Sequence, residues 1–264
     1  MKKFLTVALA GVLAASMLFT GCSKKAESKV PDKLIVGTNA EFPPFEYMND
    51  KKQPEGFDIA MIKEIGKRMG KKVEIKNMDF KSLIGAMESD SINAIIAGMT
   101  KTEKREKAVD FSDSYYTTNQ AIILKKDSKI TKLAQLDGKK IGVQEGTTGD
   151  LISSGDKFGD GKKAKVLVKG AKVKRFKKGV DAVMDLKNGS VDAVVIDELT
   201  ANEFVKKNAK KLKIVIDSAG SEYYCIALTK GNTAYKEEVN KQIKAIKEDG
   251  TYDKLKAKYI DSKN

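Results

Sequence analysis

The chain has 264 residues, of which 41% are hydrophobic and 33% are charged, and this balance excludes a disordered chain and a chain embedded in a membrane. Its formal charge is +14, but the lysines are spread in short pairs, there are three arginines, and no arginines alternate with aromatic residues, so nucleic-acid binding is not predicted. The chain has no histidine and two cysteines, and no metal-ligand spacing or phosphate-binding glycine loop, so neither a metal site nor a cofactor is predicted.

The N-terminus has the layout of a secretory signal. Two lysines precede an uncharged run, Phe4–Phe19, which ends in small residues before Cys22. The run is shorter than the roughly 20 residues that a membrane-spanning helix needs. Its last residues, FTGC, resemble the lipobox of bacterial lipoproteins, in which the chain is cut before a cysteine that carries lipid. We expect a signal peptide at 1–21, and a lipidated Cys22 with a polar tether at 22–32; the alternative is a soluble exported protein.

Short β-branched runs then alternate with longer amphipathic segments. Strands are predicted at residues 33–38, 71–78, 92–99, 119–126, 139–144, 171–176, 191–197, 212–217 and 224–229. Helices are predicted at residues 56–70, 80–90, 179–189, 197–208, 234–250 and 252–260. This alternation predicts an α/β fold with mostly parallel sheets.

Two stretches of the chain repeat one pattern. Residues 86–100 and 183–199 both contain a helix that ends in Met and an acid, then a polar turn, a small residue and a buried strand. Residues 33–42 and 139–148 both run from a lysine-led strand into a polar loop. The chain therefore divides into two related halves.

The repeat predicts two lobes and a double hinge. The expected parts are a larger lobe at 33–115 with 224–264, a smaller lobe at 119–219, and hinges near 115–119 and 220–224. Open α/β sheets bind ligands at the carboxyl ends of their strands. Four such ends, GTNAEF, AGMT, VQEGTT and VIDE, are expected to meet in one cleft between the lobes.

Six motifs appear in an order and spacing that resemble a known family. They are GTNAEFPPFEY, GFDIAMIKEIGKRMG, AGMTKTEKREKAVDFSDSYY, GTTGD, VDAVVIDE and EDGTYDKLKAKYI, and they cover the chain from about Lys33 to Ile260. The chain resembles the polar amino-acid-binding proteins of bacterial ABC importers, which are extracytoplasmic solute-binding proteins of family 3. The resemblance implies a two-lobed periplasmic-binding-protein-like fold of type II, with the two lobes joined by a two-strand hinge.

The resemblance assigns roles to the residues that would hold the ligand's main chain. Arg105 is implied to bind the carboxylate, because its planar fork of donors forms two parallel bonds that a lysine cannot. Backbone N–H groups of Thr100 and Thr148 are implied to assist it. The α-ammonium is implied to bind the Asp197 side chain, the Thr100 hydroxyl and the Gly98 carbonyl. The alternatives are a surface arginine and residues that cap helices.

The resemblance also places the ligand side chain. Phe42 and Phe57 match two aromatic positions that sandwich it, although either could be a core residue; other aromatic residues, Phe80 included, are expected in the core. Glu41 between aromatic faces suits a cationic side chain. The positions that vary with the ligand are Asn39, Glu41, Gln144, Ile196 and the stretch Glu222–Tyr224.

The expected function is therefore binding of a free amino acid, arginine or lysine in preference, and delivery by cleft closure to the permease and ATPase subunits of an ABC importer. Glutamine, cystine or another polar amino acid is an open alternative. Two readings of other classes are a dehydratase-like enzyme on the same fold, which lacks a histidine base here, and a sensory module that acts through a partner. A monomer, anchored to the membrane through its N-terminal lipid on the periplasmic or cell-surface face, is expected.

Overall fold

The computed structural model describes residues 29–159, 164–206 and 208–261. The predicted signal peptide and Cys22 lie outside the described residues. Among the described helices, none is long and apolar enough to cross a membrane.

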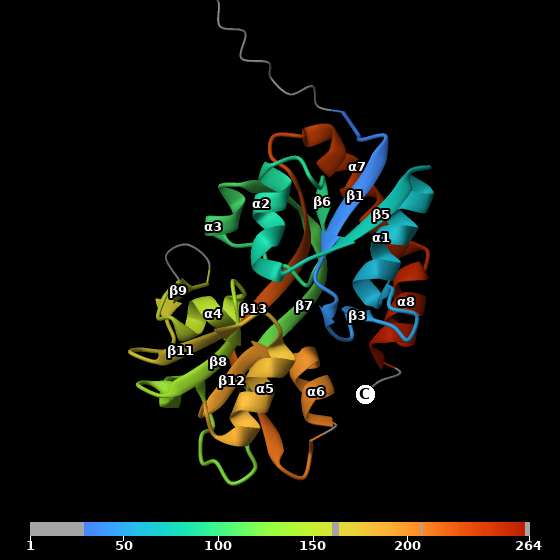
Figure 1. Ribbon diagram of the computed structural model, residues 1–264. Helices are drawn as coiled ribbons and strands as arrows, with labels where there is room; N and C mark the ends of the chain where they lie inside the picture. The colour runs from blue at the N-terminus through green and yellow to red at the C-terminus, as the bar shows by residue number, and fades with distance from the viewer. Residues whose placement is uncertain (1–28, 160–163, 207, 262–264) are drawn as a thin grey trace, which may run out of the picture.

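The chain folds into two lobes, one above the other in Figure 1. The upper lobe contains, in chain order, β1 (Lys33–Thr38), β2 (Glu41–Phe42), β3 (Glu46–Met48), β4 (Pro54–Glu55), α1 (Phe57–Arg68), β5 (Lys72–Asn77), the 3-10 turn η1 (Phe80–Ser82), α2 (Leu83–Glu88), β6 (Ala94–Ile95) and α3 (Glu103–Glu106), and later α7 (Thr233–Glu248) and α8 (Thr251–Tyr259). The lower lobe contains η2 (Leu133–Leu136), β8 (Lys140–Gln144), α4 (Thr148–Ser153), β9 (Lys157–Phe158), β10 (Lys165–Val166), β11 (Lys172–Phe176), α5 (Gly179–Asn188), β12 (Ala193–Asp197) and α6 (Glu198–Lys206).

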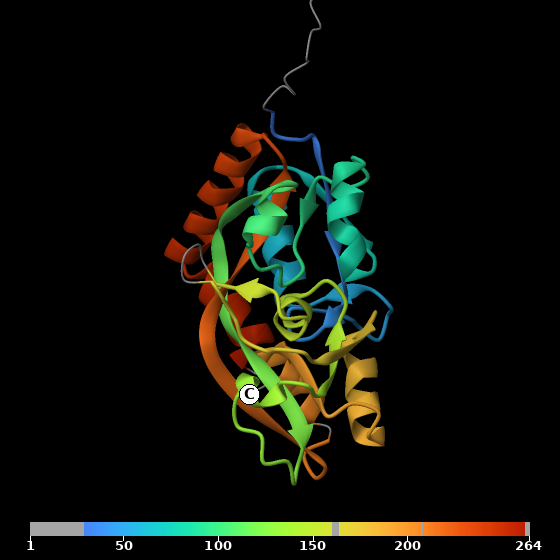
Figure 2. The same cartoon turned by 90° about the vertical axis from the view of Figure 1, so that its left-hand side faces the viewer.

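Two long antiparallel strands, β7 (Val109–Lys125) and β13 (Leu212–Thr229), run through both lobes. Figure 2 shows them side by side where the chain passes from one lobe to the other. Their register is irregular between Asp217 and Glu222, where β13 leaves the lower lobe. Above this break, Glu222 pairs with Thr118 and Tyr224 pairs with Tyr116.

The rest of the sheet is parallel within each lobe. The strand order is β11-β8-β12-β7-β13-β6-β1-β5, with parallel pairing among β5, β1 and β6 above and among β11, β8 and β12 below. The two triplets are the related halves that the repeat predicted, and β6 and β12 occupy equivalent places beside the long strands. The predicted α/β class with parallel sheets is confirmed, with the long antiparallel pair as the addition.

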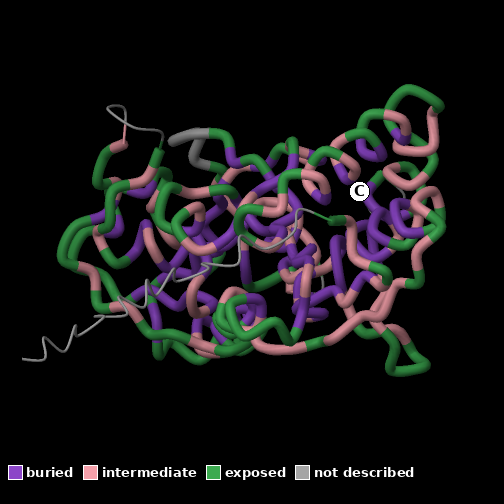
Figure 3. The backbone as a smooth tube through the Cα atoms, turned by 90° about the horizontal axis from the view of Figure 1, so that it is seen from above, coloured by how far each residue is buried: buried purple, intermediate pink, exposed green. Residues whose placement is uncertain are grey.

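The predicted elements are present with three differences. The strand expected at 92–99 is limited to β6, Ala94–Ile95. The segments 212–217 and 224–229 were expected as separate strands but form one strand, and β7 begins ten residues before the predicted strand at 119, because each supplies the other's hydrogen-bonding partners across the junction. Residues 80–90 begin with a 3-10 turn before α2. Buried residues form the interior of both lobes, and exposed residues lie on the outside (Figure 3).

Candidate functional site

A small enclosed cavity lies where the strand ends of the two lobes meet. The upper lobe contributes Asn39, Phe42, Phe80, Ala97, Gly98, Thr100 and Arg105, and the lower lobe contributes Gln144, Thr147, Thr148 and Asp197. Its volume is about 10 Å³. A larger hollow of about 640 Å³ lies next to it, and Phe80 and Arg105 line both, so these two side chains form the wall between them. All four strand ends that the sequence predicted to meet are present at the cavity.

Arg105 is the buried cation of the site. Its side chain lies on α3, whose first turn is capped by the Thr102 hydroxyl, and the residue is 7% exposed. The guanidinium donates to the Thr100 carbonyl at 2.5 Å and, across the lobes, to the Gly146 carbonyl at 3.0 Å. These bonds use two of its five N–H donors. It lies over the Phe80 ring, 5.4 Å from the centroid. Burial lowers the pKa of Arg105 to about 10, so the group stays charged at neutral pH.

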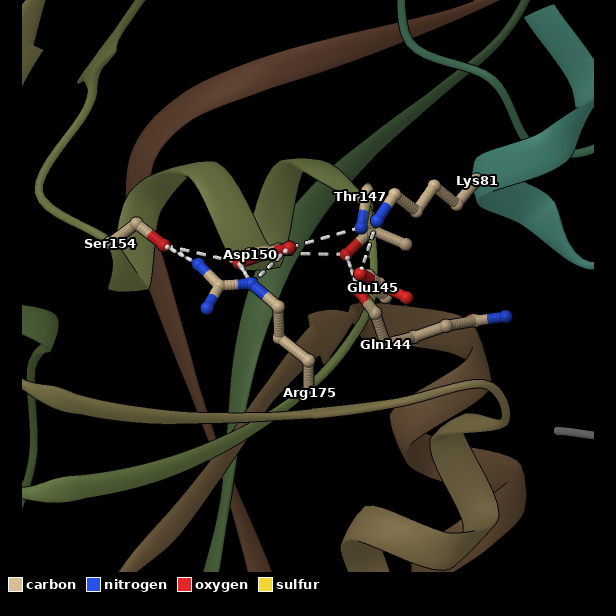
Figure 4. Close-up of polar contacts among 8 residues, drawn as sticks. Lys81, Gln144, Glu145, Thr147, Asp150, Ser154 and Arg175 are labelled. Carbon is tan, nitrogen blue, oxygen red and sulfur yellow. Dashed lines mark hydrogen bonds and ion pairs between the residues drawn. The ribbon is translucent and has the colours of Figure 1, made fainter. Parts of the chain in front are cut away.

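The loop that faces Arg105 is held by a network of lower-lobe residues and by Lys81 of the upper lobe, which pairs with Glu145 at 2.6 Å (Figure 4). Thr147 caps α4: its hydroxyl accepts from the Asp150 N–H at 3.3 Å and donates to the Gln144 carbonyl at 2.8 Å. The Asp150 carboxylate accepts from the Gly146 N–H at 3.0 Å and pairs with Arg175 at 3.0 Å. These bonds fix the loop before α4, and with it the Gly146 carbonyl that Arg105 contacts.

Two buried carboxyl groups lie opposite the guanidinium. Asp197, at the end of β12, is 4% exposed and accepts from the Tyr224 hydroxyl at 2.8 Å. Glu222, on β13, is 1% exposed, and one of its oxygens accepts from the hydroxyls of Thr100 at 2.5 Å and Thr148 at 2.7 Å. Burial raises the pKa of Asp197 well above its usual range, and the nearby Glu222 charge adds to this. Burial likewise raises the pKa of Glu222.

Gly98 sits at the equivalent strand end in the upper lobe. Its φ of 53° is left-handed, and a Cβ there would lie 3.1 Å from the Phe42 ring, so the position requires glycine. Its N–H donates to Asp58 at 2.8 Å, and the Tyr115 hydroxyl donates to the same oxygen at 2.7 Å. Behind them, burial raises the pKa of Glu46 well above its usual range, and the neighbouring Asp58 adds to this.

The far end of the cavity is neutral. The Gln144 amide donates to Asn39 Oδ1 at 2.8 Å, which is a second direct bond between the lobes. Asn39 is itself fixed by its donation to the Met78 carbonyl at 2.8 Å. Phe42, stacked on Phe45, covers one wall of this end.

The structure therefore brings together eight of the ten residues expected at the ligand: Arg105, Thr100, Gly98, Asp197, Thr148, Phe42, Asn39 and Gln144. It places Glu41 outside the cavity, in an ion pair of 2.7 Å with Lys178 of the lower lobe. This pair directs the Glu41 carboxylate toward Lys178, and its expected part in side-chain selection stays a prediction.

Phe57 is also placed away from the cavity. It is fully buried at the start of α1 and packs edge-on against Phe45, Tyr116 and Tyr252. Phe80, which was expected in the core, lines the cavity in its place. Phe57 begins α1 and Phe80 begins η1, so their surroundings in sequence are alike and do not indicate which of the two reaches the cavity.

Sequence reasoning missed the part that Glu222 plays. It lies in the stretch expected to vary with the ligand, between a polar turn and an apolar strand, and its neighbour Tyr223 is exposed. The available signal was strand alternation near a predicted hinge. Residues 222 and 224 of a strand point to the same face, so Glu222 lies on the same side as the buried Tyr224.

Two lobes that meet over a buried guanidinium and buried carboxyl groups define a receptor for a small zwitterionic solute rather than for a polymer. Residues 34–262 match the bacterial extracellular solute-binding proteins, family 3, and the chain belongs to this family.

Individual relatives agree with the family. The chain is 34% identical over 263 residues to the arginine-binding extracellular protein ArtP of Bacillus subtilis (strain 168), with 98% of each chain covered. Among solved structures, it is similar to an ancestral arginine-binding protein bound to arginine, at 41% identity and a TM-score of 0.76, with 88% of this chain and all of that one covered. An ancestral arginine-binding protein bound to glutamine matches at 42% identity and a TM-score of 0.77, covering 88% of this chain and 99% of that one.

Proposed function

We propose that this protein binds a free L-amino acid of net positive charge, arginine or lysine, outside the cytoplasm and delivers it to the permease and ATPase subunits of an ABC importer. The observation that carries the proposal is that Arg105 and Asp197 line one cavity, with the Glu222 carboxylate bonded to two of its lining residues, Thr100 and Thr148. A zwitterion leaves water for a closed site at acceptable cost when both its charges find partners. A guanidinium for the carboxylate and acids for the ammonium meet that condition.

Each main-chain group of the ligand has a partner in this arrangement. Arg105 binds the carboxylate, assisted by the backbone N–H groups of Thr100 and Thr148. The ammonium donates to Asp197, the Thr100 hydroxyl and the Gly98 carbonyl. The side chain extends toward Asn39 and Gln144 between the rings of Phe42 and Phe80. A delocalised cation gains from those ring faces, which supports a cationic ligand.

Binding requires the lobes to separate and close. A cavity of about 10 Å³ has room for about one water molecule, so an amino acid enters after the lobes part. Residues 115–119 and 220–224 are the hinges, with 33–115 and 224–264 moving against 119–219. The register break in β13 beside them supports this position. Contacts that the ligand makes with both lobes favour the closed form, and the importer recognises that form.

The relatives support arginine as the first candidate and glutamine as the second. The ArtP protein is named for arginine, whereas one of the two similar ancestral structures holds glutamine. The amide pair at the neutral end of the cavity suits glutamine as well as a guanidinium. Binding without catalysis is proposed over the dehydratase reading, because the cavity offers partners for a zwitterion and no histidine.

We also propose that Cys22 carries a lipid that anchors a monomeric protein to the outer face of the membrane. The FTGC motif after an uncharged run supports it. Mass spectrometry of the protein purified from membranes should find the lipid on an N-terminal Cys22. A mature N-terminus downstream of Cys22 would contradict the anchor and leave the receptor function untouched.

The decisive experiment is a melting screen of the chain from Ser23 onward, unfolded and refolded to remove carried ligand. It covers the proteinogenic amino acids, ornithine, citrulline and cystine. A ligand at 100 times its dissociation constant adds about 2.7 kcal/mol, or roughly 2–4 °C or more. We expect the largest shifts with arginine and lysine. A shift with glutamine alone would mean that the ligand is a neutral polar amino acid and not a cationic one. No shift with any compound would contradict the receptor function.

A further inference from the structure

Glu222 ties the two lobes together from a strand that belongs to neither alone. One carboxylate oxygen, Oε2, accepts a hydrogen bond from the hydroxyl of Thr100, which precedes α3 in the upper lobe. The same oxygen accepts from the hydroxyl of Thr148, which begins α4 in the lower lobe. Its other oxygen, Oε1, is buried and has no hydrogen-bond partner among the described residues. The carboxylate thus lies behind two threonines that line the cavity, with one oxygen left without a hydrogen-bond partner among the described residues.

These bonds set the direction of both hydroxyl protons. A threonine hydroxyl has one proton to donate and two lone pairs. Thr148 donates to Glu222 and accepts from the Gln120 amide at 3.2 Å. Thr100 donates to Glu222, so its oxygen faces the cavity as an acceptor for a cation. Glu222 therefore orients Thr100 for an ammonium group.

The buried charges around the cavity do not balance. With every group ionised, Asp197 and Glu222 face the one guanidinium of Arg105, which is the sole cation among the described residues that line the cavity. Behind Asp197, the acids Glu46 and Asp58 of β3 and α1 and the hydroxyls of Tyr115 and Tyr224 add no positive charge. Asp197, Glu222 and Arg105 alone thus give one negative charge in excess, and an ionised Glu46 or Asp58 would add to it.

We propose, on the basis of the proposed function, that Glu222 is a specificity-determining residue: its carboxylate supplies the excess negative charge that selects an amino acid of net positive charge. The Asp197–Glu222 pair holds one proton when the site is empty. An amino acid of net charge +1 neutralises both carboxylates, and the proton leaves to solvent. A neutral amino acid leaves one negative charge unbalanced, so the pair keeps its proton when that ligand binds. Burial raises the pKa of both acids, and the Glu222 charge raises that of Asp197 further, which agrees with a shared proton.

The variant Glu222→Gln removes this charge with little change of shape. Both threonines donate to one oxygen, so the single carbonyl oxygen of glutamine keeps both bonds. The probes are arginine and citrulline, which have nearly the same shape and differ by one positive charge. We expect the variant to bind arginine about tenfold or more weakly, and citrulline within about threefold of the wild type. The matched control is Glu41→Gln, an acid outside the cavity, which should keep the wild-type ratio.

A second measurement does not depend on any variant. Calorimetry of arginine binding to the wild type at pH 7, in phosphate and in Tris, gives the number of protons released from the difference in buffer ionisation heat. We expect release of close to one proton with arginine, none with citrulline, and none with arginine in Glu222→Gln.

Three results would overturn the inference. The first is an equal loss of affinity for arginine and citrulline in Glu222→Gln, which would make Glu222 a structural bridge. The second is no loss for either ligand in that variant, so that the ratio of their affinities is again unchanged. The third is that the wild type releases no proton when it binds arginine. A wild type that binds no amino acid would overturn the proposed function itself and this inference with it. Wild-type binding of citrulline with none of arginine would keep the receptor and reject the charge selection.

Discussion

The two ends of the cavity are built on opposite principles. At one end, Arg105, Asp197 and Glu222 are ionisable and buried, and each is bonded to a hydroxyl or a carbonyl group. At the other end, Asn39 and Gln144 are neutral amides bonded to each other across the lobes. The ionisable residues lie at the end that is proposed to bind the main-chain groups, which all α-amino acids share. The neutral amides lie at the end that is proposed to bind the side chain, which differs between amino acids. The comparison teaches that a preference for cations in this chain must come from the charged end, because the acid expected at the neutral end is paired elsewhere.

The largest effect is expected from the charged end. Arg105→Lys keeps the positive charge and removes the planar fork and its bond to the Gly146 carbonyl. Affinity for arginine should fall by on the order of 100-fold or more, about 3 kcal/mol, by calorimetry. Arg68→Lys is the control, since Arg68 pairs with Glu64 and Asp249 away from the cavity, and it should leave affinity unchanged. A loss below about fivefold in Arg105→Lys would show that the fork is unimportant.

A smaller effect is expected at the neutral end. Gln144→Ala removes its bonds to Asn39 and to the Lys177 carbonyl at 3.1 Å. Affinity should fall by roughly 1–2 kcal/mol, as expected for a lost buried hydrogen bond. The loss should be the same for arginine and citrulline, because a neutral amide does not distinguish their charge. A loss of affinity for only arginine or only citrulline would contradict the division of the cavity into a charged end and a neutral end.

The acids beneath the charged end predict a pH dependence of stability. Burial first, and Asp58 second, raise the pKa of Glu46 well above its usual range, so the folded protein holds a proton that the unfolded chain releases near pH 4.5. The folded state binds more protons above that pH, and stability contributed by Glu46 is lost as pH rises through its folded pKa. The stability of Glu46→Gln relative to the wild type should therefore increase between pH 5 and 8, by on the order of 1 kcal/mol, in melting experiments.

An exposed acid serves as the control for this experiment. Lys33 lowers the pKa of Glu74, so the stability of Glu74→Gln relative to the wild type should not increase between pH 5 and 8. A constant offset between Glu46→Gln and the wild type across this range would mean that Glu46 does not hold a proton in the folded protein.

The smallest effect is expected outside both ends. Lys178→Gln breaks the interlobe pair with Glu41, in which both side chains remain partly exposed. Such pairs contribute about 0.2–1 kcal/mol, so arginine affinity should fall by threefold or less, and the difference should vanish in high salt. Lys244→Gln, which breaks a pair within α7, is the control for loss of a surface lysine. A tenfold loss in Lys178→Gln would show that this pair stabilises the closed form by more than a surface ion pair does.

The sequence predicted what depends on local pattern. The repeat located β6 and β12 as equivalent strands, and their ends Gly98 and Asp197 do face one cavity. The role of Arg105 was implied by the resemblance, through the motif AGMTKTEKREKAVDFSDSYY. The repeat rests on spacing that a single chain displays, and the role of Arg105 rests on the resemblance.

The rest depends on contacts between distant segments. The pairing of Glu41 with Lys178 joins positions 137 residues apart in different lobes, and nothing near Glu41 in the sequence indicates it. Phe57 and Phe80 have similar surroundings in sequence, and packing against Tyr252, almost 200 residues away, decides which is core. Glu222 meets Thr100 and Thr148 only after β13 has crossed between the lobes.

The most direct test of the account compares arginine with agmatine, which is arginine without its carboxylate, by calorimetry on the refolded chain from Ser23 onward. The account predicts saturable binding of arginine, and binding of agmatine weaker by on the order of 100-fold or more, because Arg105 would remain buried without its anion. Agmatine that binds within about threefold of arginine would contradict the central claim that this cavity recognises the main chain of an amino acid through Arg105.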